Sequence, residues 1–451
     1  MNARVAGIGH ARNTDPQIGD WLNAIDPTGR DDAAKANIRE ARRSYDRANK
    51  LPAKLAEDLS RLTSLAQGVW ASARKADNFA EFAPTLTEIL NLKREEAACL
   101  QQDGGDLYDA LLDGFEPGMS TENLTNILGK LRPALVALRG KIENSSFQPK
   151  PLTGRFDEAK QMEMARRLAT VFNYDWDAGR MDRSVHPFSS GYRSDSRVTT
   201  RVNPENVFDC LYSAIHEVGH ANYENGRDPA MDRTPAGGHA SMGIHESQSR
   251  MLENQIGRSR AFMDWLYPQM VDVFGDIGVD GPDELFAVVN RVESGFIRTE
   301  SDEVHYNLHV LMRFDLEQQL ISGDLEVADL EEAWNDRFFA DFGRKIDRAS
   351  NGVLQDIHWA VGLFGYFPTY SLGNMYAAEL FAAMGKTLPD RDHCIARGEL
   401  SPLSNWLEDN IHRKGNVYPA RDLMRQACGK EADEHALVEY LNQKFGGLYG
   451  F

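Results

Sequence analysis

The sequence predicts a mainly α-helical protein, and three observations bear on its fold class and domain organisation. Apolar residues recur at helical spacing through most of the 451 residues. One stretch, residues 183–203, breaks this pattern: it is rich in Ser, Thr, Gly and Arg and alternates near its end like a β-strand. No stretch has the composition of a linker. We therefore expect a single helical domain over residues 1–451 wrapped around a deep cleft; two lobes, residues 1–182 and 183–451, would also fit.

Composition limits the classes of partner. The net charge is −18 and the pI is near 5.2, which argues against nucleic acid or an anionic membrane as a partner, because both require a basic face. No stretch reaches the length of an apolar membrane span, and residues 1–17 lack the core of a signal peptide. The four cysteines are far apart and form no CxxC pair. We expect a cytoplasmic protein with reduced thiols.

The N-terminal part is predicted to consist of helices, because apolar residues recur there every three or four positions between charged ones. These predicted helices cover residues 31–49, 51–76, 79–102, 121–143 and 156–172. Residues 183–203 follow, with Val198 and Val202 alternating with polar residues. They indicate either a small β-element or an extended connecting loop, and both readings remain open.

The next helix carries the main chemical motif. Residues 216–220 read His-Glu-Val-Gly-His, an HExxH motif. We expect the helix to start at Asn203-Pro204-Glu205 and to end at Gly226. His216 and His220 then lie one turn apart on one face and can hold a zinc ion. Glu217 can accept a proton from a water that such an ion activates.

A hydrolytic zinc ion needs three protein ligands and one open position. Residues 226–243 are predicted to be a loop, and a new helix begins near Ile244. Glu246 on that helix, 26 residues after His220, is the leading third ligand. Two histidines compete with it. His239 lies in the Gly-rich loop, which positions a ligand poorly, and His245 points about 100° away from Glu246.

Further helices are predicted over residues 283–292, 302–321 and 325–342, followed by shorter ones. His305 and His309 have i, i+4 spacing, but such a pair is more often on a surface or behind a site than a second metal centre. Residues 352–359 and 364–370 are rich in polar and aromatic side chains, and the second of these segments is predicted to contain a turn. A peptidase that acts at a C-terminus needs a cation for the free carboxylate, and an oxyanion donor besides the metal.

Five motifs together resemble the carboxypeptidase Taq family of metallocarboxypeptidases. The family patterns are HExxH, HESQ, DxRxT, IRxxAD and GxxQDxHW. In this chain they correspond to 216–220, His245-Glu246-Ser247-Gln248, Asp195-Ser-Arg197-Val-Thr199, Ile297-Arg298-Thr-Glu-Ser301-Asp302 and Gly352-Val-Leu-Gln355-Asp356-Ile-His358-Trp359, in the family's order. The motifs span a little over a third of the chain. Ser301 replaces the family's Ala, and the first 190 residues match only in length and helical character.

The resemblance implies an almost entirely helical, neurolysin-like fold with a substrate cleft and a small β-element near the active site, usually in a homodimer. It implies one zinc ion per chain, replaceable by cobalt, on His216, His220 and Glu246. The implied activity is removal of C-terminal residues from peptides with broad specificity but poor action next to proline. Peptides with a free C-terminus are thus the expected partners.

The resemblance also suggests roles for the other residues. Glu217 matches the general base, and Arg298 matches an arginine that meets the substrate carboxylate. In our own reading of the mechanism, Arg197 and His309 help Arg298 to anchor that carboxylate. Substrate-binding roles in the motifs thought to close the groove fall on Arg197, Gln355, Asp356 and His358. Tyr370 is the preferred oxyanion donor, and Tyr366 and Tyr376 compete with it. Two other functions remain open: a helical HExxH oligopeptidase or endopeptidase, and a non-catalytic, zinc-stabilised peptide-binding protein.

Overall fold

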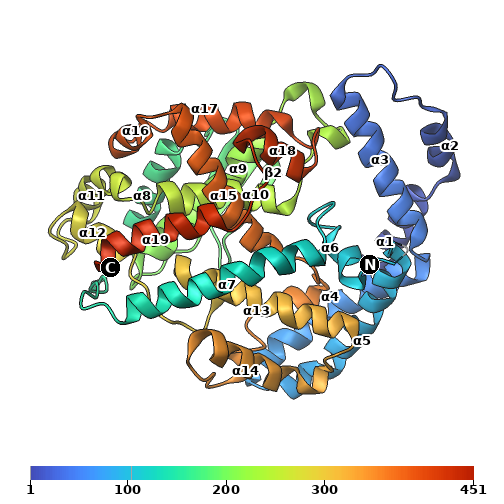
Figure 1. Cartoon of the computed structure of the whole chain (residues 1–451), viewed down its shortest axis with the longest axis horizontal. Coiled ribbons are helices and arrows are strands. Elements are labelled where there is room, and N and C mark those ends of the chain that lie inside the picture. The colour runs from blue at the N-terminus through green and yellow to red at the C-terminus, as the bar shows by residue number, and fades with distance from the viewer. Residues whose placement is uncertain (1, 103, 194) are drawn as a thin grey trace. The chain divides into compact units, whose positions relative to one another are not determined.

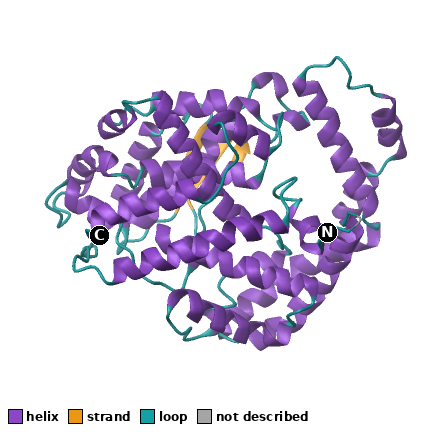
Figure 2. Ribbon diagram, in the orientation of Figure 1, coloured by secondary structure: helices purple, strands orange, loops and turns teal. Residues whose placement is uncertain are grey.

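The structure, a computed structural model, describes residues 2–102, 104–193 and 195–451. Helices make up most of these residues (Figure 1), and the strands among them form one small sheet (Figure 2). The predicted mainly α-helical class is therefore confirmed. Within the described ranges, no helix combines the length and the apolar character that crossing a membrane requires.

The chain divides into two compact units, and each unit takes two separate segments of the sequence. Residues 1–137 and 293–371 form the first unit, and residues 138–292 and 372–451 form the second. Two long helices, α7 (Thr121–Glu143) and α15 (Pro368–Thr387), each contain a boundary between the units. The single domain over residues 1–451 and the division after residue 182 stay predictions.

The first unit consists, in its described residues, of helices and the loops between them, without a strand. Besides parts of α7 and α15 it contains α1 (Asn2–Asn13), α2 (Pro16–Ala24), α3 (Asp32–Lys50), α4 (Ala53–Ala76), α5 (Phe79–Leu100), α6 (Leu107–Leu112), η4 (Arg298–Glu300), α13 (Glu303–Ser322), η5 (Val327–Asp329), α14 (Leu330–Phe342), η6 (Ala349–Asn351) and η7 (His358–Val361). The helices predicted at 31–49, 51–76, 79–102 and 121–143 are all present. Local chemistry explains their starts: the Asp31 carboxylate accepts from Ala34 N, and the Asn78 side chain accepts from Ala80 N.

Helix α13 is the most deeply buried helix of this unit. The Asp302 carboxylate caps it by accepting from Val304 N and His305 N, and Gly323 ends it with a φ of 92°. Apolar side chains lie on all sides of the helix, as expected for a central rather than an amphipathic one. Its buried polar residues, such as Arg313 and Glu317, must therefore find partners inside the protein.

The second unit combines helices with the sheet. It contains the remaining parts of α7 and α15, α8 (Glu158–Val171), β1 (Gly179–Arg183), β2 (Ser189–Tyr192), β3 (Asp195–Thr200), α9 (Val207–Asn225), η1 (Pro229–Met231), η2 (Pro235–Gly237), α10 (Met242–Arg250), the π-helical η3 (Met251–Ile256), α11 (Arg260–Phe274), α12 (Pro282–Val289), α16 (Arg391–Arg397), α17 (Ser401–Asn410), η8 (His412–Lys414), α18 (Ala420–Cys428) and α19 (His435–Tyr449). Helix α9 packs against α8, α10, β2 and β3. The helix that carries the HExxH motif is thus packed inside this unit.

The sheet has the strand order β1-β3-β2. Strand β3 pairs in parallel with β1 (Gly179 opposite Ser196) and antiparallel with β2 (Ser189 opposite Val198). Of the two readings of residues 183–203, the β-element is the one the structure shows; Ser194, inside that stretch, lies outside the described residues. The sheet is attached to α9 through Thr200, whose hydroxyl donates to the carbonyl of Cys210 (2.7 Å).

One predicted helix start needs correction. Helix α9 begins at Val207 rather than at 203–205, because the Asn206 side chain accepts from Phe208 N and provides the cap, while Asn203 Nδ2 donates to Asp209. The segment 364–370 contains the predicted turn, at Phe364 and Gly365, and its last residues enter α15, which starts at Pro368, so Tyr370 lies in the first turn of that helix. Proline is well suited to a first helical turn, where its missing N–H costs nothing.

Candidate metal centre and peptide-binding residues

The HExxH motif lies within α9, as its spacing requires. His216 and His220 are on one face, with ring centroids 4.8 Å apart. Both rings are partly buried, with side-chain exposures of 18% and 16%. Burial, together with the neighbouring His245 and His216, holds the pKa of His220 well below its usual range. His220 is therefore neutral, which is the state that coordinates a metal.

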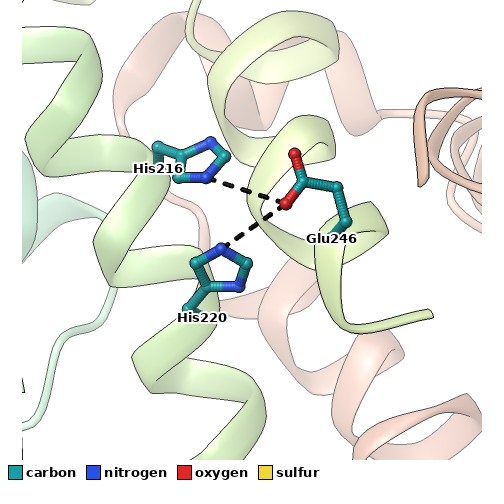
Figure 3. Close-up of side chains that lie close together, drawn as sticks. All are labelled: His216, His220 and Glu246. Carbon is teal, nitrogen blue, oxygen red and sulfur yellow. Dashed lines mark ion pairs between the residues drawn. The ribbon is translucent and has the colours of Figure 1, made fainter. Parts of the chain in front are cut away.

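Glu246, on α10, completes a three-residue cluster with the two histidines (Figure 3). Its Oε2 lies 3.9 Å from His216 Nε2 and 3.6 Å from His220 Nε2. Ligand atoms around a tetrahedral zinc ion are about 3.3–3.4 Å apart, so small side-chain rotations would suffice to bind one. Two imidazole nitrogens and one carboxylate oxygen form the donor set of a catalytic site with an open fourth position. The described residues therefore fit the expected ion.

Two glycines allow the helices to approach closely enough for this cluster to form. A Cβ at Gly219 would lie 2.5 Å from Ser249 Cα, so α9 and α10 touch through their backbones. A Cβ at Gly373, on α15, would lie 2.5 Å from Glu246 Cγ. Any larger residue at either position would have to displace the element that carries the third ligand.

His216 is held from behind by Glu253. Its Nδ1 lies 3.0 Å from Glu253 Oε2, and Glu253 is also close to Arg250 (3.2 Å) and Arg258 (3.3 Å). Burial raises the pKa of Glu253, but Arg250 and the bond to His216 outweigh burial and keep this pKa well below its usual range. A carboxylate on the outer nitrogen fixes a ligand's ring orientation and increases its basicity. Glu253 belongs to the π-helical η3, a distortion often found at functional sites.

His220 has its own partner, His245. The two Nδ1 atoms are 2.7 Å apart, so one of them donates to the other, and His245 Nε2 lies 2.9 Å from Glu224 Oε1. Arg227 pairs with the same Glu224 oxygen. His245, one of the sequence rivals for the third ligand, thus lies behind His220. His239, the other rival, packs edge-on against His245 with ring centroids 5.5 Å apart.

Glu217 has the environment of a general base. It is 7% exposed. Burial raises the pKa of Glu217 to about 7; Glu246 and Glu253 act in the same direction, while His216 and a hydrogen bond to the Ser189 backbone oppose it. A carboxyl group with this pKa can accept and return a proton near neutrality. The contact with Ser189 also places the edge strand β2 beside this residue.

In the first unit, Arg298 is the centre of a second cluster. It is 4% exposed, and its Nε and Nη2 donate to Asp356 Oδ1 (3.2 and 2.9 Å) while Nη1 donates to the Tyr306 hydroxyl (3.0 Å). Its backbone N–H donates to Gln355 Oε1 (2.9 Å). Burial disfavours the charge of Arg298, but Asp356 outweighs this effect and raises the pKa well above its usual range. The cation is therefore permanent.

Tyr370 and His358 belong to the same cluster. The Arg298 guanidinium carbon lies 4.8 Å from the centroid of the Tyr370 ring, and His358 Nε2 lies 3.1 Å from the Tyr370 hydroxyl. Of the two competing tyrosines, Tyr366 is adjacent, with its ring centroid 5.2 Å from that of Tyr370. Tyr376 is in the second unit and is 4% exposed. The structure therefore brings Arg298, Gln355, Asp356, His358 and Tyr370 together.

Two residues expected to contact substrate have positions that do not by themselves indicate this role. His309 is fully buried, packs on Phe338 and Phe342, and has no hydrogen-bond partner on either ring nitrogen in the described chain. Arg197 is exposed on β3 and is held by Asp195 through two bonds of 2.8 and 2.9 Å. Their substrate-binding roles stay predictions. His305 is paired with Asp302 (2.8 Å), which accounts for the other member of the histidine pair.

Sequence reasoning missed several residues of both clusters. Glu253, Arg250 and Glu224 support the metal ligands, and Arg313 pairs with Asp356 through its Nε (2.7 Å). A signal existed for one of them: Arg250 is four residues after Glu246, where a helical partner is expected. The others depend on tertiary contacts that no spacing reveals.

Comparison with known proteins agrees with this site. The model of the family described as "Carboxypeptidase Taq (M32) metallopeptidase" matches residues 1–445. The chain is 38% identical to thermostable carboxypeptidase 1 of Thermus thermophilus, covering 99% of this chain and 91% of that protein. It is 35% identical to carboxypeptidase 1 of Bacillus subtilis, covering 93% and 84%. The crystal structure of a carboxypeptidase of the same family from Deinococcus radiodurans superposes with a TM-score of 0.94 at 34% identity, covering 99% and 90%.

Proposed function

Because the chain belongs to the carboxypeptidase Taq family and is thus a metal-dependent carboxypeptidase, we propose that it uses one zinc ion to release single C-terminal residues from peptides of varied sequence. The observation that carries the proposal is the cluster of His216, His220 and Glu246 beside the buried Glu217. A zinc ion held there would lower the pKa of a water molecule and polarise the scissile carbonyl. We expect the enzyme to cleave poorly at bonds next to proline, as the resemblance implies.

The protein side chains then move the protons. Glu217 accepts the proton of the attacking water and passes it to the departing amine, which its pKa of about 7 permits. The Tyr370 hydroxyl donates to the oxygen that becomes negative. His358 Nε2, 3.1 Å from that hydroxyl, orients it. In this proposal Glu246 and the two histidines only hold the ion.

Arg298 is proposed to bind the terminal carboxylate of the peptide. A guanidinium has five N–H groups, and Asp356 and Tyr306 occupy three of those of Arg298. Nη1 and Nη2 each carry a second N–H group, and we propose that these two bind the carboxylate, because a pair of guanidinium N–H groups forms a fork that matches it. Asp356 thus leaves Arg298 both charged and able to bind. Gln355, Arg197 and His309 are proposed to support peptide binding less directly.

A comparison of free and blocked peptides tests this function. The protein is incubated with zinc and a peptide ending in a free carboxylate, or with the same peptide amidated, and the products are followed by mass spectrometry. A ladder of single-residue losses from the free acid alone is the expected result. Internal fragments would indicate the alternative endopeptidase, and no cleavage of either peptide would indicate the non-catalytic alternative. Arg298→Lys should lower kcat/KM for the free acid by about 10²-fold or more, because lysine keeps the charge without the fork.

The metal identity has its own test. Protein stripped by a chelator should recover activity with one equivalent of Zn²⁺, and Co²⁺ should substitute. If neither ion restores turnover while Mn²⁺ does, the zinc assignment is wrong.

We also propose a homodimer in the cytoplasm. The resemblance supports the dimer, and the four free cysteines, Cys99, Cys210, Cys394 and Cys428, suit a reducing compartment. Sedimentation equilibrium should give twice the chain mass of 50.6 kDa. Cell fractionation should place the protein with cytoplasmic markers, and recovery in another fraction would contradict the proposal.

A further inference from the structure

A buried carboxylate in the first unit has no part in the chemistry described so far. Glu317, on α13, is fully buried. Its Oε2 accepts from the Tyr108 hydroxyl (2.7 Å) and from Gly365 N (3.0 Å), and its Oε1 accepts from the Trp359 indole N–H (2.7 Å). Three neutral donors from three places in the sequence therefore converge on one side chain.

The segment that Glu317 holds is the one that carries the peptide-binding residues. Trp359 follows His358 directly, and Gly365 lies five residues before Tyr370. Between them the backbone forms the short 3₁₀ turn η7 and a few further local bonds, such as that from Leu363 N to the carbonyl of His358. These bonds fix the local shape of the segment but not its place relative to the neighbouring helices. Contacts from outside the segment must fix its position.

Helix α13 holds this segment at two points. Arg313 donates to Asp356 at the beginning of the segment, through Nε (2.7 Å). One helical turn later, Glu317 accepts from Trp359 and Gly365. Because both anchoring side chains project from one rigid helix, they set the path of the chain from Asp356 to Gly365.

The other side of the segment packs on α6. Gly365 has a φ of +86°, and a Cβ there would lie 2.8 Å from Leu112 N, so the backbones of the loop and α6 touch. Phe115 packs edge-on against Tyr366 with ring centroids 5.1 Å apart. Tyr108, on α6, completes the contact by donating to Glu317. The N-terminal helices, which the sequence motifs do not cover, thus contact the peptide-binding segment.

Only a carboxylate satisfies all three donors. An ionised Glu accepts at both oxygens and donates at neither. A Gln in the same place would direct its NH₂ group at the Trp359 N–H or at the Gly365 N–H, because donors face both oxygens. Burial also makes this charge costly, raising the pKa of Glu317 to about 7.

We propose that Glu317 is a positioning residue for the carboxypeptidase reaction, which fixes residues 356–370 between α13 and α6 so that Asp356, His358 and Tyr370 keep their arrangement around Arg298. The inference rests on the peptide-binding roles proposed above for those residues. Glu317 itself does not touch the peptide. Its effect on catalysis passes through the segment that it holds.

Glu317→Gln tests the proposal in the full-length, metal-loaded protein. Hydrogen exchange should accelerate in peptides covering residues 356–370 and not in those covering the zinc ligands. For one free-acid peptide, kcat/KM should fall at least about tenfold, with bound metal unchanged. Glu326→Gln, an exposed carboxylate in the same unit, is the matched control and should leave exchange and kinetics unchanged. Unchanged exchange, or a kinetic loss without faster exchange in residues 356–370, overturns the proposal.

Tyr108→Phe covers the case in which Glu317→Gln does not fold. The substitution removes one donor to Glu317 with almost no change in side-chain shape. Tyr108 is also far from Arg298 in the sequence. A smaller acceleration of exchange over residues 356–370 is expected, with a two- to fivefold loss of kcat/KM; no change in either quantity overturns the proposal. Failure of the proposed carboxylate binding can be told apart from failure of the Glu317 proposal. In the first case the unmodified enzyme would cut amidated and free-acid peptides equally. Hydrogen exchange in the variants would still report on Glu317.

Discussion

Replacing Glu253 by Gln should weaken metal binding by tenfold to a hundredfold. Loss of a carboxylate behind a histidine ligand typically has this effect, which corresponds to about 1.4–2.7 kcal/mol. The structure favours the lower half of the range. Gln can direct its oxygen at His216 Nδ1, which is 3.0 Å from the present Glu253 Oε2, but its NH₂ group then faces Arg258. Glu253→Ala removes both contacts and should reach the upper end.

The assay is a competition between the protein and a chelator of known zinc affinity. Turnover measured at saturating zinc should return to within a fewfold of the parent value, because Glu217 is untouched. Glu205→Gln, an exposed carboxylate in the same unit, is the control and should bind zinc like the parent. Equal zinc affinity in Glu253→Gln and the parent would refute the reasoning. So would a loss of turnover that excess zinc does not restore, because Glu253 would then act on something other than the ligand.

Three further predictions concern packing, pH and thiol chemistry. Gly219→Ala forces a methyl group against Ser249 Cα and should lower the free energy of unfolding by about 1–3 kcal/mol, whereas Gly447→Ala, in open space on α19, should raise it by about 0.5–1 kcal/mol in urea titrations. The folded-state pKa of Glu317, about 7, exceeds the ordinary 4.5, so the folded state takes up a proton between these values. The contribution of Glu317 to stability should therefore fall as pH rises from about 4.5 to 7, by about 3 kcal/mol, and Glu317→Gln should remove this contribution while leaving that of Glu217, whose pKa is also about 7. Burial raises the pKa of Cys210 to about 11, so iodoacetamide at pH 8 should label it at least ~100-fold more slowly than a free thiol; rapid labelling, read by mass spectrometry, would contradict this.

The sequence allowed prediction of what lies within one or two helical turns. The relation between His216 and His220 follows from the helical repeat alone. Glu246 could be chosen because its helix begins after a recognisable loop, at the Ser241 cap that accepts from Ile244 N. To predict these residues, it was enough to assume that the helix carrying Glu246 runs antiparallel to the helix carrying the two histidines.

Contacts between distant segments could not be predicted in this way. Tyr108 and Glu317 are 209 positions apart, and nothing in either neighbourhood indicates the other. The burial of His309 is also a tertiary property, since its own helix is apolar on all sides and gives no direction.

The π-helical turn at Met251–Ile256 has a consequence for how relatives of this chain should be aligned. A π turn holds one residue more than an α turn, so a homologue with a regular helix here would be one residue shorter. An alignment that places the resulting gap on the wrong side of Glu253 assigns the partner of His216 to the wrong column. Conservation scores for this carboxylate would then be too low even if every homologue kept it. Backbone geometry, rather than residue similarity, should decide the gap.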